Sequence, residues 1–87
     1  DRVFTTFLAK LFLNHVEPLI QPYIFNEAKR KIDPNFWDNN EKKLRDKIDY
    51  YLKKLQKEGL IRKIKLHSRL NAWVAVDKQR LIDLIIL

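Results

Sequence analysis

The chain has 87 residues, enough for one domain with a modest core, and it lacks cysteine, which excludes disulfides and thiolate metal sites. Its hydrophobic content of 46% is typical of a folded chain, and no apolar run approaches the roughly 20 residues that a membrane span requires. All of the formal net charge of +7 comes from positions 29–65, which hold 13 of the 18 basic residues; this segregation indicates a polyanionic partner, most commonly nucleic acid.

The first predicted element is an amphipathic helix over 3–16. Its apolar residues recur at spacings of three and four, so that one side of the helix is apolar. They are Phe4, Phe7, Leu8, Leu11, Phe12 and Val16. Pro18 ends the helix, because the residue before a proline is pushed out of helical geometry. Residues 19–25 contain a second proline and are interpreted as a connector with room for one short strand.

A short second helix is predicted over 26–32, with Asn26 as its cap. A turn follows at residues 33–35. Phe36 and Trp37 come directly after this turn, and we expect both to lie in the core beneath it.

The third predicted helix, over 40–58, has clear signals at both ends. Asp38 and Glu41 have the spacing of a capping box, and Gly59 supplies a left-handed stop. The side of this helix that we expect to be buried consists of Leu44, Ile48, Tyr51, Leu52 and Leu55.

After Gly59 the hydrophobic period changes to two, which predicts strands over 60–66 and 72–76 joined by a hairpin loop. Asp77 then caps a last helix over 78–86. We expect this helix to turn Leu81, Leu84 and Ile85 inward.

This order of elements resembles the winged helix-turn-helix family of DNA-binding domains over residues 3–77. The most specific part is the segment LRDKIDYYLKKLQKEGLI at 44–61, which is similar to that family's recognition helix running into its wing. The resemblance implies an α+β, mostly helical fold with a three-helix core, a two-stranded β wing and a C-terminal helix. One departure is the eight-residue stretch at 33–40, which is longer than the tight turn of the simplest members.

The side of the third helix opposite Ile48 is basic, if each residue advances by 100°. A helix about 10–12 Å across fits a DNA major groove about 12 Å wide. The residues that we expect in this groove are Lys42, Lys43, Arg45, Asp46, Lys47 and Tyr50. The alternative is a solvated surface on which Asp46 forms an ordinary salt bridge.

Other cations are candidates for contacts with the DNA backbone. They are Lys29, Arg30, Lys31, Lys53, Lys54 and Lys57. The first three equally fit ordinary cations that are favoured at a helix C-terminus. In the resembling family wing tips reach a neighbouring minor groove or the backbone, which implies such a role for Arg62, Lys63, Lys65, His67, Ser68 and Arg69. The alternative for the wing is an edge strand that charge keeps from aggregating.

The C-terminal run is more apolar than one helix face can bury, which makes it a candidate homodimer seam or docking surface. It consists of Leu84, Ile85, Ile86 and Leu87. This run favours an alternative function, in which the domain is a protein-interaction subunit of a replication, transcription or membrane-remodelling assembly.

We expect no enzymatic activity, no metal and no cofactor. His15 and His67 lie far apart in the sequence with no paired carboxylates near either, and a single glycine cannot build a phosphate-cradling loop.

The start at Asp1 and the lack of methionine favour a piece of a longer protein, and an intracellular location (cytoplasm, nucleoid or nucleus) is expected by default. The absence of Cys and Met, the single Gly and the abundant Lys and Ile follow thermophile trends.

Overall fold

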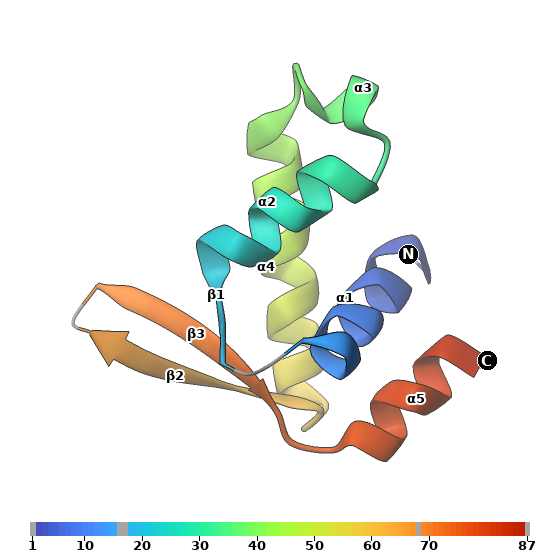
Figure 1. Ribbon diagram of the computed structural model, residues 1–87, viewed down its shortest axis with the longest axis vertical. Helices are drawn as coiled ribbons and strands as arrows, with labels where there is room; N and C mark the ends of the chain where they lie inside the picture. Colours follow the sequence, from blue (N-terminus) through green and yellow to red (C-terminus); the bar gives the residue numbers. More distant parts are fainter. Residues whose placement is uncertain (1, 16–17, 68, 87) are drawn as a thin grey trace.

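The computed structural model describes residues 2–15, 18–67 and 69–86. Helices and strands follow one another along this part of the chain (Figure 1). They are α1 (Arg2–Asn14), β1 (Leu19–Ile20), α2 (Gln21–Lys31), α3 (Pro34–Trp37), α4 (Glu41–Lys57), β2 (Ile61–His67), β3 (Leu70–Ala75) and α5 (Lys78–Ile86). The fold is therefore α+β and mostly helical, with a small antiparallel sheet, as the sequence predicts.

α4 occupies the centre of the fold because one of its sides is apolar along its whole length. The buried residues on this side are Leu44, Ile48, Tyr51, Leu52 and Leu55. Burying each aliphatic side chain contributes about 1.5–3 kcal/mol, so this side fixes the helix against α1, α2 and the sheet. The predicted helix over 40–58 is confirmed, and Gly59 ends it at a φ of +80°.

α1 lies beside α4 and α5 and buries its apolar side between them (Figure 1). The Phe4 ring stacks on Tyr51 at a centroid distance of 5.5 Å and meets Trp37 edge-on at 6.2 Å. The predicted helix over 3–16 is confirmed in its central part, but Val16 lies outside the described residues.

The sheet has the strand order β1-β3-β2, so β3 is the central strand. On its inner face, Leu19, Ile61 and Trp73 are buried in the core. The hairpin of β2 and β3 confirms the predicted pair of strands, although β3 begins at Leu70, two residues earlier than expected. β1 occupies the connector in which one short strand was foreseen, and its pairing with β3 was not predicted.

The predicted start of the second helix is wrong, because α2 begins at Gln21 and takes in most of the supposed connector. Pro22 lies in the first turn, where its missing N–H needs no partner and its fixed φ suits a helix. Asn26 is therefore an exposed residue within α2 and not a cap. The proline that suggested a connector marks a helix start.

The stretch between α2 and α4 folds as a short helix, α3, in place of the predicted turn. Asp33 precedes it in the left-handed region at a φ of +39°, which Asp tolerates better than most residues. Trp37 is buried as expected, whereas Phe36 is 49% exposed and does not belong to the core.

The predicted capping box of α4 is also wrong. Asp38 ends α3, and the residue that precedes α4 is Asn40, whose side-chain amide donates to the Phe36 carbonyl at 2.7 Å. The Glu41 carboxylate pairs with Lys29 of α2 and so ties the start of α4 to α2.

α5 follows Asp77, whose carboxylate accepts a hydrogen bond from the Arg80 backbone N–H at 3.2 Å, which confirms the predicted cap. Leu81 is buried, and Leu84 and Ile85 pack half-buried against the core. Among the described residues no helix has the length and apolar character needed to span a bilayer.

Candidate nucleic-acid interface

The side of α4 opposite Ile48 carries exposed, mostly basic residues, and we call it the outer face of α4. It consists of Lys43, Asp46, Tyr50, Lys53 and Lys57, with Lys42, Lys47 and Lys54 on its flanks. Tyr50 is 60% exposed and its ring meets Tyr51 edge-on. The helix therefore separates a leucine-rich buried side from a lysine-rich side that is open to solvent.

The flanking cations of α4 lean over aromatic rings of its neighbours. The Arg45 guanidinium lies 4.7 Å from the centroid of the Phe25 ring of α2. On the other flank the Lys47 ammonium lies 5.7 Å from the ring of Phe4 in α1. Such contacts hold an exposed cation in place while its charge stays available to solvent. Arg45 thus borders α2 and Lys47 borders α1.

Four ion pairs are formed in the described part of the chain, and only one involves the outer face of α4. The Lys53 ammonium lies 3.3 Å from Asp49, one turn earlier in the helix. Exposed pairs of this kind contribute only about 0.3–0.5 kcal/mol. The salt bridge that the alternative interpretation gives to Asp46 is not formed within the described residues.

The three cations at the end of α2 are paired with two acids of the fold itself. Arg30 donates to Glu27 at 2.9 Å, which lowers the pKa of that carboxyl, and Lys31 approaches the same carboxylate at 3.4 Å. The hydrogen bond between Lys29 and Glu41 raises the pKa of the lysine and lowers that of the glutamate. A DNA phosphate would have to compete with these carboxylates for all three predicted backbone contacts.

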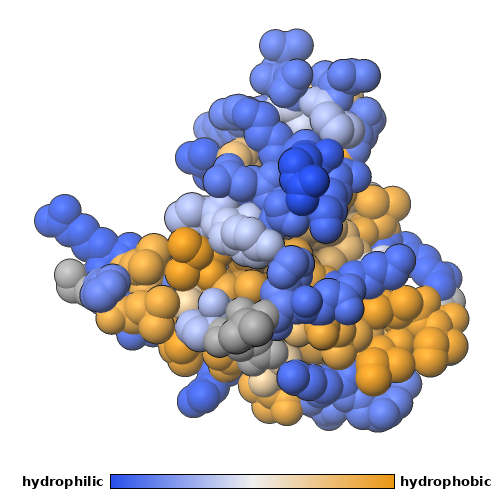
Figure 2. All heavy atoms as spheres, in the orientation of Figure 1, coloured by the Kyte–Doolittle hydropathy of each residue, from blue (hydrophilic) through white to orange (hydrophobic). Residues whose placement is uncertain are grey.

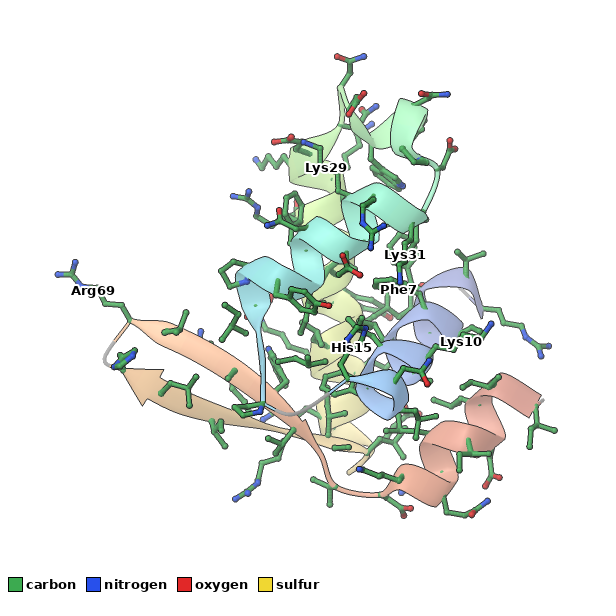
Figure 3. All side chains as sticks on the ribbon, in the orientation of Figure 1. Phe7, Lys10, His15, Lys29, Lys31 and Arg69 are labelled. Carbon is green, nitrogen blue, oxygen red and sulfur yellow. The ribbon has the colours of Figure 1, made fainter. Side chains whose placement is uncertain are left out.

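A groove lies between α2, the N-terminal half of α4 and the far end of the hairpin. Its lining comprises Gln21, Pro22, Phe25, Asn26, Lys29, Glu41, Arg45, Ile48, Arg69, Leu70 and Asn71. Arg69 projects from the end of the hairpin, away from the helices (Figure 3). The groove therefore joins the start of α4 to the hairpin, with cations on both walls.

The hairpin divides its cations between the two faces of the sheet. Lys63 and Lys65 lie on the inner face, since they pair with Trp73 and Asn71 across the strands, and the Lys63 ammonium is 5.9 Å from the Trp73 ring. Arg62 lies on the opposite face. His67 and Arg69 are exposed, and the predicted wing residue Ser68 lies outside the described residues.

A chain of hydrogen bonds that was not predicted connects α2, α4 and the hairpin. The Gln21 side chain donates to Asp49 at 3.1 Å and accepts from the Trp73 indole N–H at 3.4 Å. Because these bonds join three elements, they help to set the angle between α4 and the hairpin. Gln21 is a positioning residue, and no pattern in the sequence singles it out.

A second hollow lies between α1 and the end of α2, where Figure 3 labels Phe7, Lys10, His15 and Lys31. His15 follows α1 and lies with its Nδ1 3.3 Å from the Tyr23 hydroxyl. Of the two lysines that line this hollow, Lys31 is paired with Glu27, whereas Lys10 has no ion pair in the described part of the chain. No group of three His, Cys, Asp or Glu in the described residues could hold a metal ion.

The predicted C-terminal docking surface is smaller than the sequence suggests. Leu84 and Ile85 are half-buried against the core, which leaves Ile86 as its strongly exposed member at 73%; Leu87 lies outside the described residues. Figure 2 shows apolar surface over α1 and α5 and a second apolar area over the hairpin.

Comparison of the chain with protein-family models, curated proteins and solved structures gave no match.

Proposed function

We propose that this chain is a winged-helix domain that binds double-stranded DNA, in transcriptional regulation or genome handling. The N-terminal half of α4 enters the major groove, and the β2–β3 hairpin lies against the backbone or the adjoining minor groove. The order of helices and strands and the strand order β1-β3-β2 support this fold assignment. α3 is then an insertion between the two helices of the helix-turn-helix.

The observation that carries the proposal is the division of α4 into two sides. Its apolar residues are buried, while Lys43, Lys47 and Lys57 are exposed and form no ion pair in the described chain. Unpaired lysines on one side of a rigid helix can release counterions from DNA without first breaking internal contacts. Lys63 and Lys65 on the sheet are two further exposed cations.

The length of α4 limits which residues reach base edges. Its 17 residues span about 26 Å at 1.5 Å per residue, longer than one pass through a groove about 12 Å wide. We therefore assign Lys42, Lys43, Asp46 and Lys47 to the groove, together with Tyr50 at its border. Lys53, Lys54 and Lys57 then face the phosphates.

A gel-shift titration of a mixed-sequence duplex across salt concentrations tests the proposal. With four to six phosphate contacts, log affinity falls with log salt at a slope of roughly −4 to −5. Replacing Lys43 and Lys47 together by alanine weakens binding at least tenfold, whereas the matched pair Lys10→Ala and Lys78→Ala changes it less than twofold. A flat salt response, or equal losses for the two pairs, would overturn the proposal.

A further inference from the structure

The outer face of the sheet is mostly apolar, and no helix in the described part of the chain lies over it. By this name we mean the side opposite the core, on which Ile20, Ile64 and Val74 lie half-buried around Ala72, with the exposed Arg62 beside Val74. These residues do not belong to the main core cluster. Val76, just past the end of β3, is 58% exposed, and Figure 2 shows apolar surface on the hairpin. A sheet face turned to water is usually polar, so this one is suited to contact with a partner.

β2 is also an edge strand of the sheet. Because the strand order is β1-β3-β2, its seven residues have no neighbour on one side within the described part of the chain. The N–H and C=O groups along such an edge can pair with an added strand. A bare backbone edge and an apolar face therefore meet along β2.

The side chains of β2 indicate which residues an added strand would need. Lys63 and Lys65 lie on the inner side, Ile64 lies between them on the outer side, and the strand contains no acidic residue. Side chains of neighbouring strands stand beside one another on the same face. A complementary strand would thus place acids beside the two lysines and an aliphatic residue beside Ile64.

We propose that β2 binds an extended protein segment in which acidic and aliphatic residues alternate, and that this segment adds as a fourth strand to the sheet. Its main chain pairs with the free edge, its acids neutralise Lys63 and Lys65, and its aliphatic residues extend the outer face. The proposal goes beyond DNA binding and does not depend on it.

A second copy of the chain is a poorer occupant of this edge. Antiparallel pairing of two β2 strands centred on Ile64 would set Lys63 of each copy opposite Lys65 of the other. Like charges directly opposite each other destabilise a sheet. Charge alone could protect an edge from aggregation, but that role does not require the aliphatic outer face.

The probe is a synthetic capped octapeptide of alternating glutamate and valine, carrying a fluorophore, with binding measured by anisotropy at low salt. We expect saturable binding, and slowed hydrogen exchange confined to amides of β2. Two control peptides are a sequence isomer with its glutamates contiguous, and a version with lysine in place of glutamate. Both are expected to bind at least tenfold more weakly.

Variants of the protein complete the test. Lys63→Glu with Lys65→Glu reduces binding of the peptide at least tenfold, and circular dichroism checks that this exposed pair leaves the fold intact. Lys43→Ala with Lys47→Ala, which we expect to weaken DNA binding, leaves peptide binding within twofold, so failure of one proposal is distinguishable from failure of the other. Equal binding of the isomeric peptide, unchanged binding to the charge-reversed variant, or dimerisation of the free domain through β2 in sedimentation would overturn the inference.

Discussion

α2 and α4 are both rich in cations, but the cations of α2 are paired with carboxylates and most of those of α4 are not. The last turn of α2 holds Lys29, Arg30 and Lys31, and each of them contacts a carboxylate of the same fold. The lysines of α4 outnumber the acids within reach, and among them only Lys53 is paired in the described residues. Both helices carry a net positive charge, and the pairing within α2 leaves α4 as the surface with available positive charge.

The physical reason is where the acids fall. Glu27 stands three and four residues before Arg30 and Lys31, the spacing at which side chains of one helix meet. In α4, Asp46 has the same spacing from Lys43 and Lys42 but follows them, which is the less favourable order, and it forms no ion pair in the described residues. A phosphate can therefore approach most lysines of α4 without displacing a carboxylate. To bind the cations of α2, it must first displace the carboxylates that pair with them.

The largest expected effect comes from reversing charge on each helix in turn. Lys43→Glu with Lys47→Glu on α4 and Arg30→Glu with Lys31→Glu on α2 change the net charge equally. We expect the first pair to weaken duplex binding roughly a hundredfold or more and the second pair less than about fivefold, because only the first replaces unpaired cations that contact the DNA directly. Fluorescence anisotropy at a single moderate salt concentration measures both. Equal losses would mean that overall charge, and not the outer face of α4, attracts DNA.

A smaller effect, of opposite sign, is expected from releasing a cation of α2. Glu41→Gln frees Lys29, which lines the groove beside Arg45. We expect the affinity for duplex DNA to rise about threefold to tenfold and the salt dependence to steepen by about 0.9, the contribution of one more phosphate contact.

The matched control is Glu27→Gln, which changes the net charge by the same amount. It frees Arg30 and Lys31, of which Lys31 borders the hollow beside α1 and not the groove. We expect its affinity to change less than twofold. A gain as large as that of Glu41→Gln would contradict a special role for the groove.

The α4–hairpin region was largely predictable from the sequence, because its elements follow strong periodic patterns. The leucine spacing of α4, the stop at Gly59 and the alternation in β2 and β3 each specify local structure directly. Exposure of the predicted basic residues on α4 then follows from burial of the opposite side. The assignment of these residues to DNA remains a proposal.

The α2–α3 region was predicted poorly because its structure depends on contacts distant in sequence. Pro22 fits a connector and a helix start equally well, and Asp38 has the spacing of a cap although Asn40 is the residue that precedes α4. The partner of Glu41 lies 12 residues earlier, on another helix, so no local pattern reveals that Lys29 is neutralised. The same holds for Gln21, whose bonds to Asp49 and Trp73 exist only in the folded chain.

The smallest effect expected is on the pH dependence of stability. It comes from the Lys29–Glu41 pair, which makes Lys29 of α2 a paired cation, unlike most lysines of α4. Folding lowers the pKa of Glu41 below its ordinary value of 4.5, because Lys29 donates a hydrogen bond to the carboxylate. The stability that this carboxylate contributes is therefore present above pH 4.5 and is lost as the pH falls through the lowered pKa. Folding raises the pKa of Lys29 above 10.5, so its contribution persists up to that pH and is lost as the pH rises further.

Thermal melts of the parent chain and Glu41→Gln from pH 2 to pH 9 measure this contribution. We expect the parent to melt at most about two degrees higher on the neutral plateau, since the pair is exposed, and the difference to vanish at the acid end. Asp46→Asn is the matched control, because Asp46 is an acid of the same helix without an ion pair in the described chain. A difference between the parent and Glu41→Gln that persisted at pH 2 would trace the effect to packing of the side chain. In that case Lys29 would not be held by charge, and the contrast between α2 and α4 would lose its physical basis.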